Sequence, residues 1–321
     1  MLDQDMQRFP EINRAYARAF QPGKLTLGLV VPLEAHHHDP VPSLKRHIQR
    51  AQLADELGFA SLWLRDVPFN VPSFGDAGQT FDPFVYLGTL SAATQRIGLG
   101  VASVILPLRH PAHVAKQAAS ADVLSDGRLL LGVASGDRPE EYPAMNMEFD
   151  SRSARFRDSF AYIRAMADEY PRGMHAQGTL TGNADMLPKP SGGRLPMLIT
   201  GGSRQDPDWV AQHGDGWITY PRAAAEQGRV VAEYRARVAA AGGPNKPVMQ
   251  SLYVDVSRDA GAPPRPIHLG FASGTDFLRQ YLTEIREFGI NHVALNLRFN
   301  SAPVEDTMKQ IADALLCEFS I

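Results

Sequence analysis

The sequence of 321 residues contains a single cysteine, Cys317, near its C-terminal end. One cysteine cannot form a disulfide within the chain, and it cannot supply a zinc site built from a cysteine cluster. This scarcity fits a reducing compartment, so the predicted location is cytoplasmic. The chain also lacks a strong excess of either charge, with a net charge of -3. Because there is no basic stripe, nucleic acid is not an expected partner.

Long apolar runs are also missing. No window approaches the roughly 18 apolar residues that a helix needs to cross a bilayer, so no membrane partner is expected. The opening stretch MLDQDMQRFPEINRAYARAF mixes charged side chains with scattered apolar ones and does not have the pattern of a secretory signal. Within an N-terminal extension, 1–24, residues 11–20 are predicted to form a short amphipathic helix.

From residue 25 onward, β-rich apolar runs alternate with segments of helical spacing. The first strand is predicted over 25–31 and the next helix over 42–59, with Gly58 in the position of a helix C-cap. The alternation continues to a closing helix at 303–319 and gives about eight strand–helix units, the number in a TIM barrel. The sequence therefore predicts an α/β fold, a single (β/α)8 barrel domain over 25–321.

Three polar segments, 136–150, 171–195 and 257–274, are too long for ordinary connections. The first and third follow strands, so we expect them as insertions on the C-terminal face, where barrel active sites lie. A doubly wound sheet is the structural alternative. That fold would place a glycine-rich turn directly after the first strand, but GLVVPLEAHHHDP at 28–40 contains no G-x-G-x-x-G motif.

Three consecutive histidines, His36 to His38, follow the first strand and resemble a metal site. Adjacent histidines in a loop point in different directions, and no later strand carries a second pair with ligand spacing. We therefore predict no metal. A solvated loop is the favoured interpretation, and the alternative places His36 and His38 at the rim of the active site as substrate contacts.

The most informative segment is RIGLGVASVILPLRHPAHVAKQAASADVLSDGRLLLGVASG, residues 96–136. It is preceded by AQLADELGFASLWLRD (51–66) and followed by MLITGGSRQDPDWVAQHGDGWI (197–218). In this order, the three blocks resemble the luciferase-like monooxygenases, the bacterial luciferase superfamily of flavin-dependent barrels. The resemblance covers most of residues 25–220.

This resemblance implies a flavin site at the ends of the barrel strands. It places a non-proline cis peptide at Ser103 and Val104, against the flavin ring. It places the flavin phosphate at the turn TGGSRQDPDW (200–209), where the following helix is expected to direct free N–H groups at the anion. The cofactor-binding residues implied in this way are Asp66, Ser103, Val104, Ala134, Ser135, Gly136, Gly201, Gly202, Ser203 and Arg204.

Two positions depart from the family pattern. Ser135 stands where luciferase has an arginine, so Arg138 or Arg204 would have to compensate in holding the phosphate. Val67 follows Asp66 where many relatives carry a catalytic histidine. Valine cannot transfer a proton, which disfavours the hydride-transfer chemistry of the deazaflavin branch more than oxygen chemistry.

The resemblance implies a two-component monooxygenase that uses reduced FMN, supplied by a flavin reductase, and oxygen on a small organic substrate. It also implies a homodimer. No residue is singled out as the catalytic acid or base. The loop at 66–83 predicts an aromatic lid, with Phe69 and Phe74 as tentative substrate contacts. The alternatives are a deazaflavin-dependent oxidoreductase, a non-catalytic flavin-binding barrel and a metal-dependent barrel hydrolase that uses the histidines.

Overall fold

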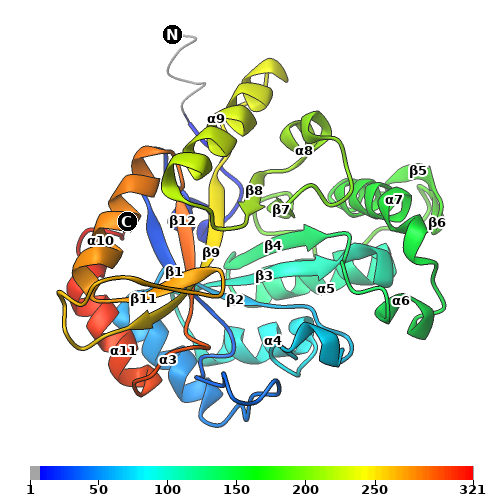
Figure 1. Ribbon diagram of the computed structural model, residues 1–321. Helices are drawn as coiled ribbons and strands as arrows, with labels where there is room; N and C mark the ends of the chain where they lie inside the picture. Colours follow the sequence, from blue (N-terminus) through cyan, green and yellow to red (C-terminus); the bar gives the residue numbers. More distant parts are fainter. Residues whose placement is uncertain (1–7, 321) are drawn as a thin grey trace.

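The computed structural model describes residues 8–320 and has a closed barrel of parallel strands at its centre, surrounded by helices (Figure 1). The strands follow one another around the barrel in the order β12, β1, β2, β3, β4, β7, β8 and β9, and β9 pairs with β12 to close it. The fold is therefore the predicted (β/α)8 barrel. The barrel strands are β1 (Thr26–Val30), β2 (Ser61–Leu64), β3 (Gly98–Ile105), β4 (Leu129–Ala134), β7 (Met197–Thr200), β8 (Gly216–Thr219), β9 (Val248–Val256) and β12 (His292–Asn296).

The outer helices begin and end at residues suited to those positions. Asp82 caps the helix that starts at Pro83, since its carboxylate accepts hydrogen bonds from the Phe84 and Val85 N–H groups. Gly58, with φ of 92°, ends the first barrel helix as predicted, although that helix begins at His47 and is shorter than expected. The outer helices are α3 (His47–Leu57), α4 (Pro83–Ala93), α5 (Pro111–Leu124), α7 (Arg152–Ala165), α8 (Pro207–His213), α9 (Ala224–Ala240), α10 (Thr275–Glu287) and α11 (Val304–Ile311), followed by a π-helical turn (Ala312–Leu316).

The strands bury apolar side chains on both faces, which is why their sequences are almost continuously apolar. The larger core cluster lies between the strands and the outer helices. A second cluster fills the barrel interior, and α2 (Arg14–Ala19) contributes to it. The Tyr16 hydroxyl donates to the Asp215 carbonyl oxygen at 2.6 Å, just before β8. The predicted N-terminal helix thus closes the N-terminal end of the barrel.

A polar network around His292 lies within this interior. His292 Nε2 accepts from the Trp63 indole N–H at 2.9 Å, and Nδ1 lies 2.7 Å from Thr26 Oγ1. Ser61 Oγ lies 2.9 Å from Nε2. Because Nε2 is an acceptor, the neutral tautomer carries its proton on Nδ1. Burial lowers the pKa of His292 to about 3, so the ring is neutral near neutral pH.

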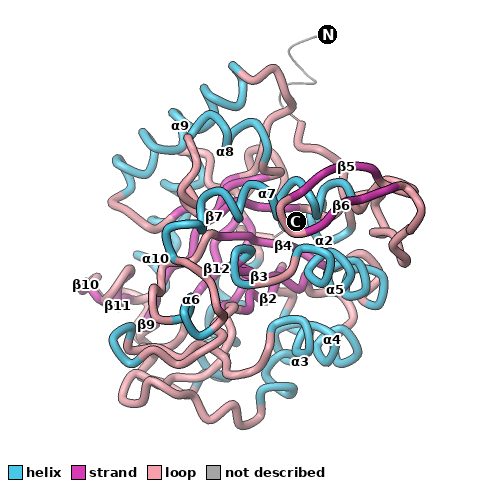
Figure 2. Tube along the Cα trace, turned by 90° about the vertical axis from the view of Figure 1, so that its right-hand side faces the viewer, coloured by secondary structure: helices cyan, strands magenta, loops and turns pink. Residues whose placement is uncertain are grey.

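Two of the long polar segments, 171–195 and 257–274, are expected from the sequence to be loops but form hairpins. β5 (Arg172–His175) and β6 (Gly178–Thr181) form an antiparallel pair outside the barrel, beside α7. β10 (Arg265–Ile267) and β11 (Gly270–Ser273) extend the main sheet, because β11 pairs with the second half of β9. Figure 2 shows the two hairpins well apart. The remaining segment, 136–150, contains the short helix α6 (Glu141–Ala144).

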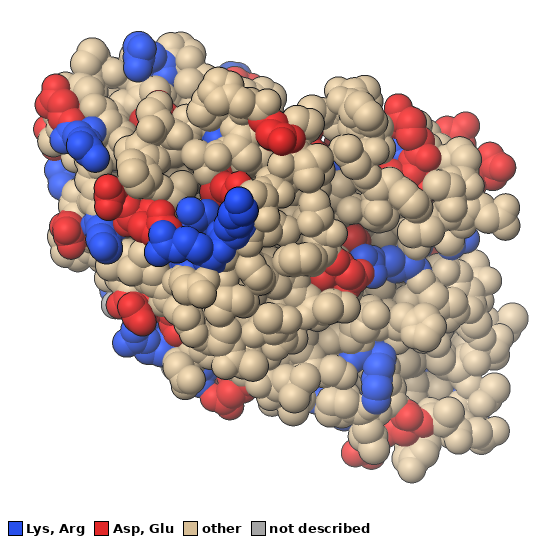
Figure 3. Space-filling model, turned by 90° about the horizontal axis from the view of Figure 1, so that it is seen from below, with Lys and Arg blue, Asp and Glu red and all other residues tan. Residues whose placement is uncertain are grey.

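Within residues 8–320, none of the helices combines the length and the apolar character needed to cross a membrane. Figure 3 shows one face of the molecule, on which Lys and Arg side chains lie close to Asp and Glu side chains. The division into an extension and a barrel domain stays a prediction, as does the expectation about nucleic acid.

Candidate active site

A cavity of about 830 Å³ opens at the C-terminal ends of the barrel strands. Its lining includes interior barrel residues, among them Trp63, Met249 and Ala294. Its walls come from the end of β3 and from the segments that follow β2, β4, β7, β8, β9 and β12. In TIM barrels this face carries the active site, so the cavity is the candidate site.

The turn after β7 forms one end of the cavity. Gly201, Ser203 and Arg204 all have positive φ, of 53°, 43° and 60°. Trp217 holds the turn in place by donating its indole N–H to the Gly201 carbonyl oxygen at 2.9 Å. Among the described residues, the backbone N–H groups from Gly202 to Arg204 donate no hydrogen bond. Successive free N–H groups in a tight turn form a concave anion-binding surface.

Arg152, at the start of α7, adds a positive charge at this end of the cavity. Its neighbour Ser153 donates from Oγ to the Arg204 carbonyl oxygen at 2.9 Å, which ties α7 to the turn. The Arg152 side chain is only 10% exposed, and its buried Nε finds no hydrogen-bond partner in the part of the chain described. Its Nη1 donates to the Phe149 carbonyl oxygen at 2.7 Å, while Nη2 makes no hydrogen bond within residues 8–320 and is the donor left for an anion.

The expected phosphate site differs in two details. The helix after the turn, α8, offers fewer free N–H groups than expected, because Pro207 has none and the Asp208 N–H already donates to the Asp206 carboxylate. The Ser203 hydroxyl donates to the Thr200 carbonyl oxygen at 2.8 Å and is therefore not a free donor. The turn offers its backbone and the charge of Arg204 instead.

The end of β3 contains a non-proline cis peptide, between Ala102 and Ser103, one bond before the position expected from the resemblance. Ser103 lines the cavity and its hydroxyl is hydrogen-bonded to that of Thr200. Val104 is fully buried in the outer core and is not part of the lining. Its side chain is therefore directed away from any ligand in the cavity.

The segment after β4 brings three predicted residues, Ala134, Ser135 and Gly136, into the cavity wall. The Ser135 carbonyl oxygen accepts a hydrogen bond from the buried Tyr142 hydroxyl. Gly136 has φ of 74°, and a Cβ there would lie 2.7 Å from Ile105 Cγ2. Only glycine fits this position, so the backbone of this segment can pack directly against Ile105 and Tyr142 beside the cavity.

Asp66 also lines the cavity, but its carboxylate is occupied. It accepts two hydrogen bonds from the Arg109 guanidinium, at 2.8 and 2.7 Å, and one from the Ile105 N–H at 3.1 Å. Through these bonds Asp66 joins the ends of β2 and β3. Because its side chain is only 1% exposed, it has little surface for a ligand. Val67 lines the cavity where a histidine would have supplied a proton.

His36 separates from the other two histidines, whereas the ring centroids of His37 and His38 lie 3.8 Å apart, contrary to the expectation that neighbouring histidines diverge. The solvated-loop interpretation is wrong for His36. Its side chain is buried, with Nδ1 3.0 Å from the Glu34 carbonyl oxygen, whereas His37 and His38 are exposed. Neither His36 nor His38 belongs to the cavity lining, so the tentative substrate role has no geometric support. Across residues 8–320 no group of three or more His, Cys, Asp and Glu side chains is arranged to hold a metal.

The two phenylalanines of the expected aromatic lid also separate. Phe74 lines the cavity, and its ring lies 4.7 Å from the Arg138 guanidinium carbon. Phe69 is exposed and is not part of the lining. Arg138 thus turns toward the β2–α4 loop rather than toward the phosphate turn, since it also donates to the Asp76 carbonyl oxygen at 3.3 Å.

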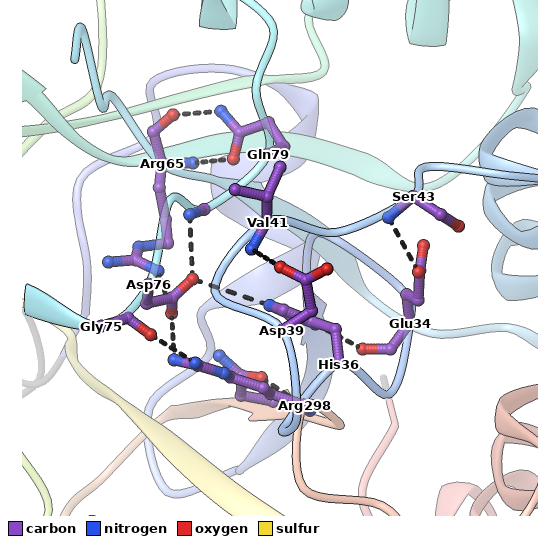
Figure 4. A network of polar contacts seen from close by, with 12 residues as sticks. Glu34, His36, Asp39, Val41, Ser43, Arg65, Gly75, Asp76, Gln79 and Arg298 are labelled. Atoms are coloured by element: carbon purple, nitrogen blue, oxygen red, sulfur yellow. Dashed lines mark hydrogen bonds and ion pairs between the residues drawn. The ribbon is translucent and has the colours of Figure 1, made fainter. Parts of the chain in front are cut away.

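Sequence reasoning missed a charged cluster at the opposite end of the cavity, formed by Arg65, Asp76 and Arg298 (Figure 4). Asp76 Oδ2 lies 2.6 Å from Arg65 Nη1 and 3.0 Å from Arg298 Nη1. Burial would raise the pKa of Asp76, but the contact with His36 and the nearby guanidinium of Arg65 outweigh it and hold the pKa well below its usual value. Only the tertiary fold joins these residues; no motif links them in sequence.

Glu141 was also missed. It is fully buried behind Arg138, 3.8 Å from Arg138 Nη1, and among the described residues neither of its carboxylate oxygens accepts a hydrogen bond from a side chain. Burial raises its pKa to about 7, although the Arg138 charge opposes this. The carboxyl group is therefore partly protonated near neutral pH.

The fold and the cavity define a (β/α)8 barrel protein whose C-terminal mouth includes a turn with backbone N–H groups that donate no hydrogen bond among the described residues. The chain belongs to the luciferase-like monooxygenase family, whose family model matches residues 25–283. Uncharacterized protein Rv0953c of Mycobacterium tuberculosis is 32% identical over 188 residues, which are 54% of this chain and 66% of that protein. The chain thus spans less than two-thirds of the length of this curated relative.

Three solved structures share the fold over nearly the whole chain. Monooxygenase RslO1 from Streptomyces bottropensis has a TM-score of 0.76 at 21% identity and covers 92% of this chain and 100% of its own. An F420-dependent secondary alcohol dehydrogenase, with an F420–acetone adduct, has a TM-score of 0.74 at 18% identity, covering 91% and 98%. The oxygenating constituent of 3,6-diketocamphane monooxygenase from Pseudomonas putida, with FMN, has a TM-score of 0.73 at 14% identity, covering 93% and 99%. At these identities the likeness shows the fold alone.

Proposed function

We propose that this protein is a flavin-dependent oxidoreductase and, more narrowly, a two-component monooxygenase acting on a small organic substrate. It would receive reduced FMN from a separate flavin reductase and use oxygen. The observation that carries the proposal is the turn from Gly202 to Arg204, which lines the cavity near Arg152 and whose N–H groups donate no hydrogen bond within the described residues. This donor set fits the phosphate dianion of FMN.

Reduced FMN, when bound, would supply the electrons and the reaction with oxygen. The chain's own residues would bind and orient it: the turn and Arg152 at the phosphate, and Ser103 with Gly136 along the wall. Trp63 and Phe74 would exclude water from the part of the cavity left for the substrate. Asp66 would act indirectly, by holding the ends of β2 and β3 together.

The choice of FMN over a deazaflavin rests on Val67. This residue lines the cavity and cannot move a proton, whereas hydride transfer to or from an alcohol or ketone needs an acid–base group. A deazaflavin-dependent oxidoreductase is the second candidate, because one structural neighbour contains F420. A non-catalytic flavin-binding barrel is the third. A homodimer and a partner reductase belong to the proposal as implications of the family.

Anaerobic titration with reduced FMN and with reduced deazaflavin tests the cofactor. The proposal expects tight binding of reduced FMN, faster reoxidation of bound FMN when oxygen is admitted, and product that carries oxygen from labelled O₂ in a substrate screen. Preference for the deazaflavin would replace the cofactor and leave the site in place. Binding of FMN with no oxygen consumption on any substrate would favour the non-catalytic barrel.

A further inference from the structure

We propose that Arg65 and Arg298, held around Asp76, form a second anion site that binds the carboxylate of an organic acid substrate. The inference rests on the proposed function, since it names the substrate class for the same cavity. Figure 4 shows the two arginines on either side of Asp76. The site lies at the ends of β2 and β12, across the barrel mouth from the turn after β7.

Asp76 arranges the two guanidinium groups but is itself covered. Its Oδ2 contacts both arginines, and its Oδ1 accepts from the Gly78 N–H at 2.9 Å. The side chain of Asp76 is 8% exposed, while those of Arg65 and Arg298 are 25% and 12% exposed. An entering ligand therefore meets the arginines before it meets the carboxylate.

Arg65 has hydrogen-bonding capacity to spare. Among residues 8–320, its guanidinium makes one hydrogen bond, from Nη1 to Asp76, which leaves Nε and Nη2 for a ligand. Arg298 Nη2 donates to the Gly75 carbonyl oxygen at 2.5 Å, and its buried Nε has no partner among the same residues. The two free donors of the planar Arg65 guanidinium match a carboxylate in a bidentate geometry, and Arg298 adds positive charge beside them.

The charges that line the cavity are mostly positive. Five arginines and three aspartates contribute to its lining, and one of the aspartates, Asp66, is neutralised by Arg109 from outside the lining. Arg138 and Arg152 have acidic neighbours outside the lining, Glu141 and Asp150, so Arg65 and Arg298 supply most of the remaining positive charge at their end of the cavity. The proximity of Arg65 also contributes, after burial, to lowering the pKa of Arg138, which shows that the like charges lie close together.

The two anion sites are far enough apart around the barrel to be filled together. Going from β2 to β7, the strands β3 and β4 intervene, and going from β7 to β12, the strands β8 and β9 intervene. Phe74 and Tyr253 line the cavity and offer apolar surface for the body of a substrate. A flavin phosphate at the turn and a substrate carboxylate at Arg65 thus use separate charges.

Calorimetric titration of the full chain with benzoate and with benzamide tests the site, because the two probes share a ring and differ in charge. We expect benzoate to bind at least about tenfold more tightly, with and without FMN present, and more weakly at high salt. In Arg65→Gln this preference should be lost, while Arg65→Lys should keep part of it. Arg258→Gln removes the same charge from a side chain that is 79% exposed outside this cavity and should behave as wild type.

Equal affinity for the two probes, undetectable benzoate binding at millimolar concentrations, or an undiminished preference in Arg65→Gln would each overturn the proposal. So would competition between benzoate and FMN, because it would place benzoate at the phosphate turn. If benzoate binds as expected and FMN does not bind at all, the anion site stands and the proposed flavin function fails.

Discussion

At the scale of single residues, the backbone at Gly136 passes so close to Ile105 and Tyr142 that no side chain fits. A Cβ there would lie 2.7 Å from Ile105 Cγ2 and 3.0 Å from the Tyr142 hydroxyl oxygen, at a φ of 74°. We predict that Gly136→Ala lowers the free energy of unfolding by about 2 kcal/mol or more, measured by urea denaturation. Gly242→Ala is the matched control, since it has a similar φ of 71° but a Cβ there meets no atom within 4 Å. Equal stability of both variants would show that the wall is not tightly packed.

Glu141 gives a second residue-scale prediction, which concerns pH. Its pKa is raised from 4.5 to about 7, so the folded state keeps a proton that the unfolded state releases. The contribution of Glu141 to the free energy of unfolding is therefore present at low pH and is lost as pH rises from about 5 to about 8, by about 1–3 kcal/mol. Glu141→Gln should flatten this slope in urea denaturation. Glu140→Gln, at the exposed neighbouring position, should leave it unchanged.

At the scale of elements, the network around His292 joins β12 to β1 and β2 inside the barrel. Burial lowers the pKa of His292 from 6.5 to about 3, so on acidification the unfolded state gains this proton at a higher pH than the folded state. Stability should fall as pH drops from about 7 to about 4, and His292 should account for about 2–3 kcal/mol of the loss.

The variant His292→Gln tests this element-scale prediction. Thermal or urea unfolding should show a less stable protein at neutral pH and a smaller loss on acidification than in wild type. His113→Gln, at an exposed position of α5, is the control and should keep the wild-type acid slope. If His292→Gln loses as much unfolding free energy between about pH 7 and pH 4 as the wild type, other groups cause the loss.

Elements with a strong apolar period could be predicted from the sequence, and the polar hairpins could not. β1 and β12 are fully buried and mostly apolar, whereas β5 and β10 consist of exposed and half-buried residues and include Gly173 and Pro266. Their pairing depends on contacts with α7 and β9 rather than on local preference.

At the scale of the whole molecule, the cavity joins side chains that no local pattern links. Gly202 to Arg204 could be predicted, because glycine in a turn between a strand and a helix signals a close backbone approach. Arg65 and Arg298 could not, because they come from opposite ends of the chain and meet only when β12 pairs with β1. The direction of individual side chains could not be predicted from the sequence either. Val104 faces the outer core instead of the cavity, and His36 is buried instead of solvated.

The central claim is that the turn after β7 and Arg152 hold a flavin phosphate. The most direct measurement compares the dissociation constants of reduced FMN and reduced riboflavin, which lacks the phosphate, under anaerobic conditions. We predict that FMN binds at least about a hundredfold more tightly, and that Arg152→Gln reduces this ratio to about tenfold or less. Equal affinity for FMN and riboflavin in the wild-type protein would contradict the account.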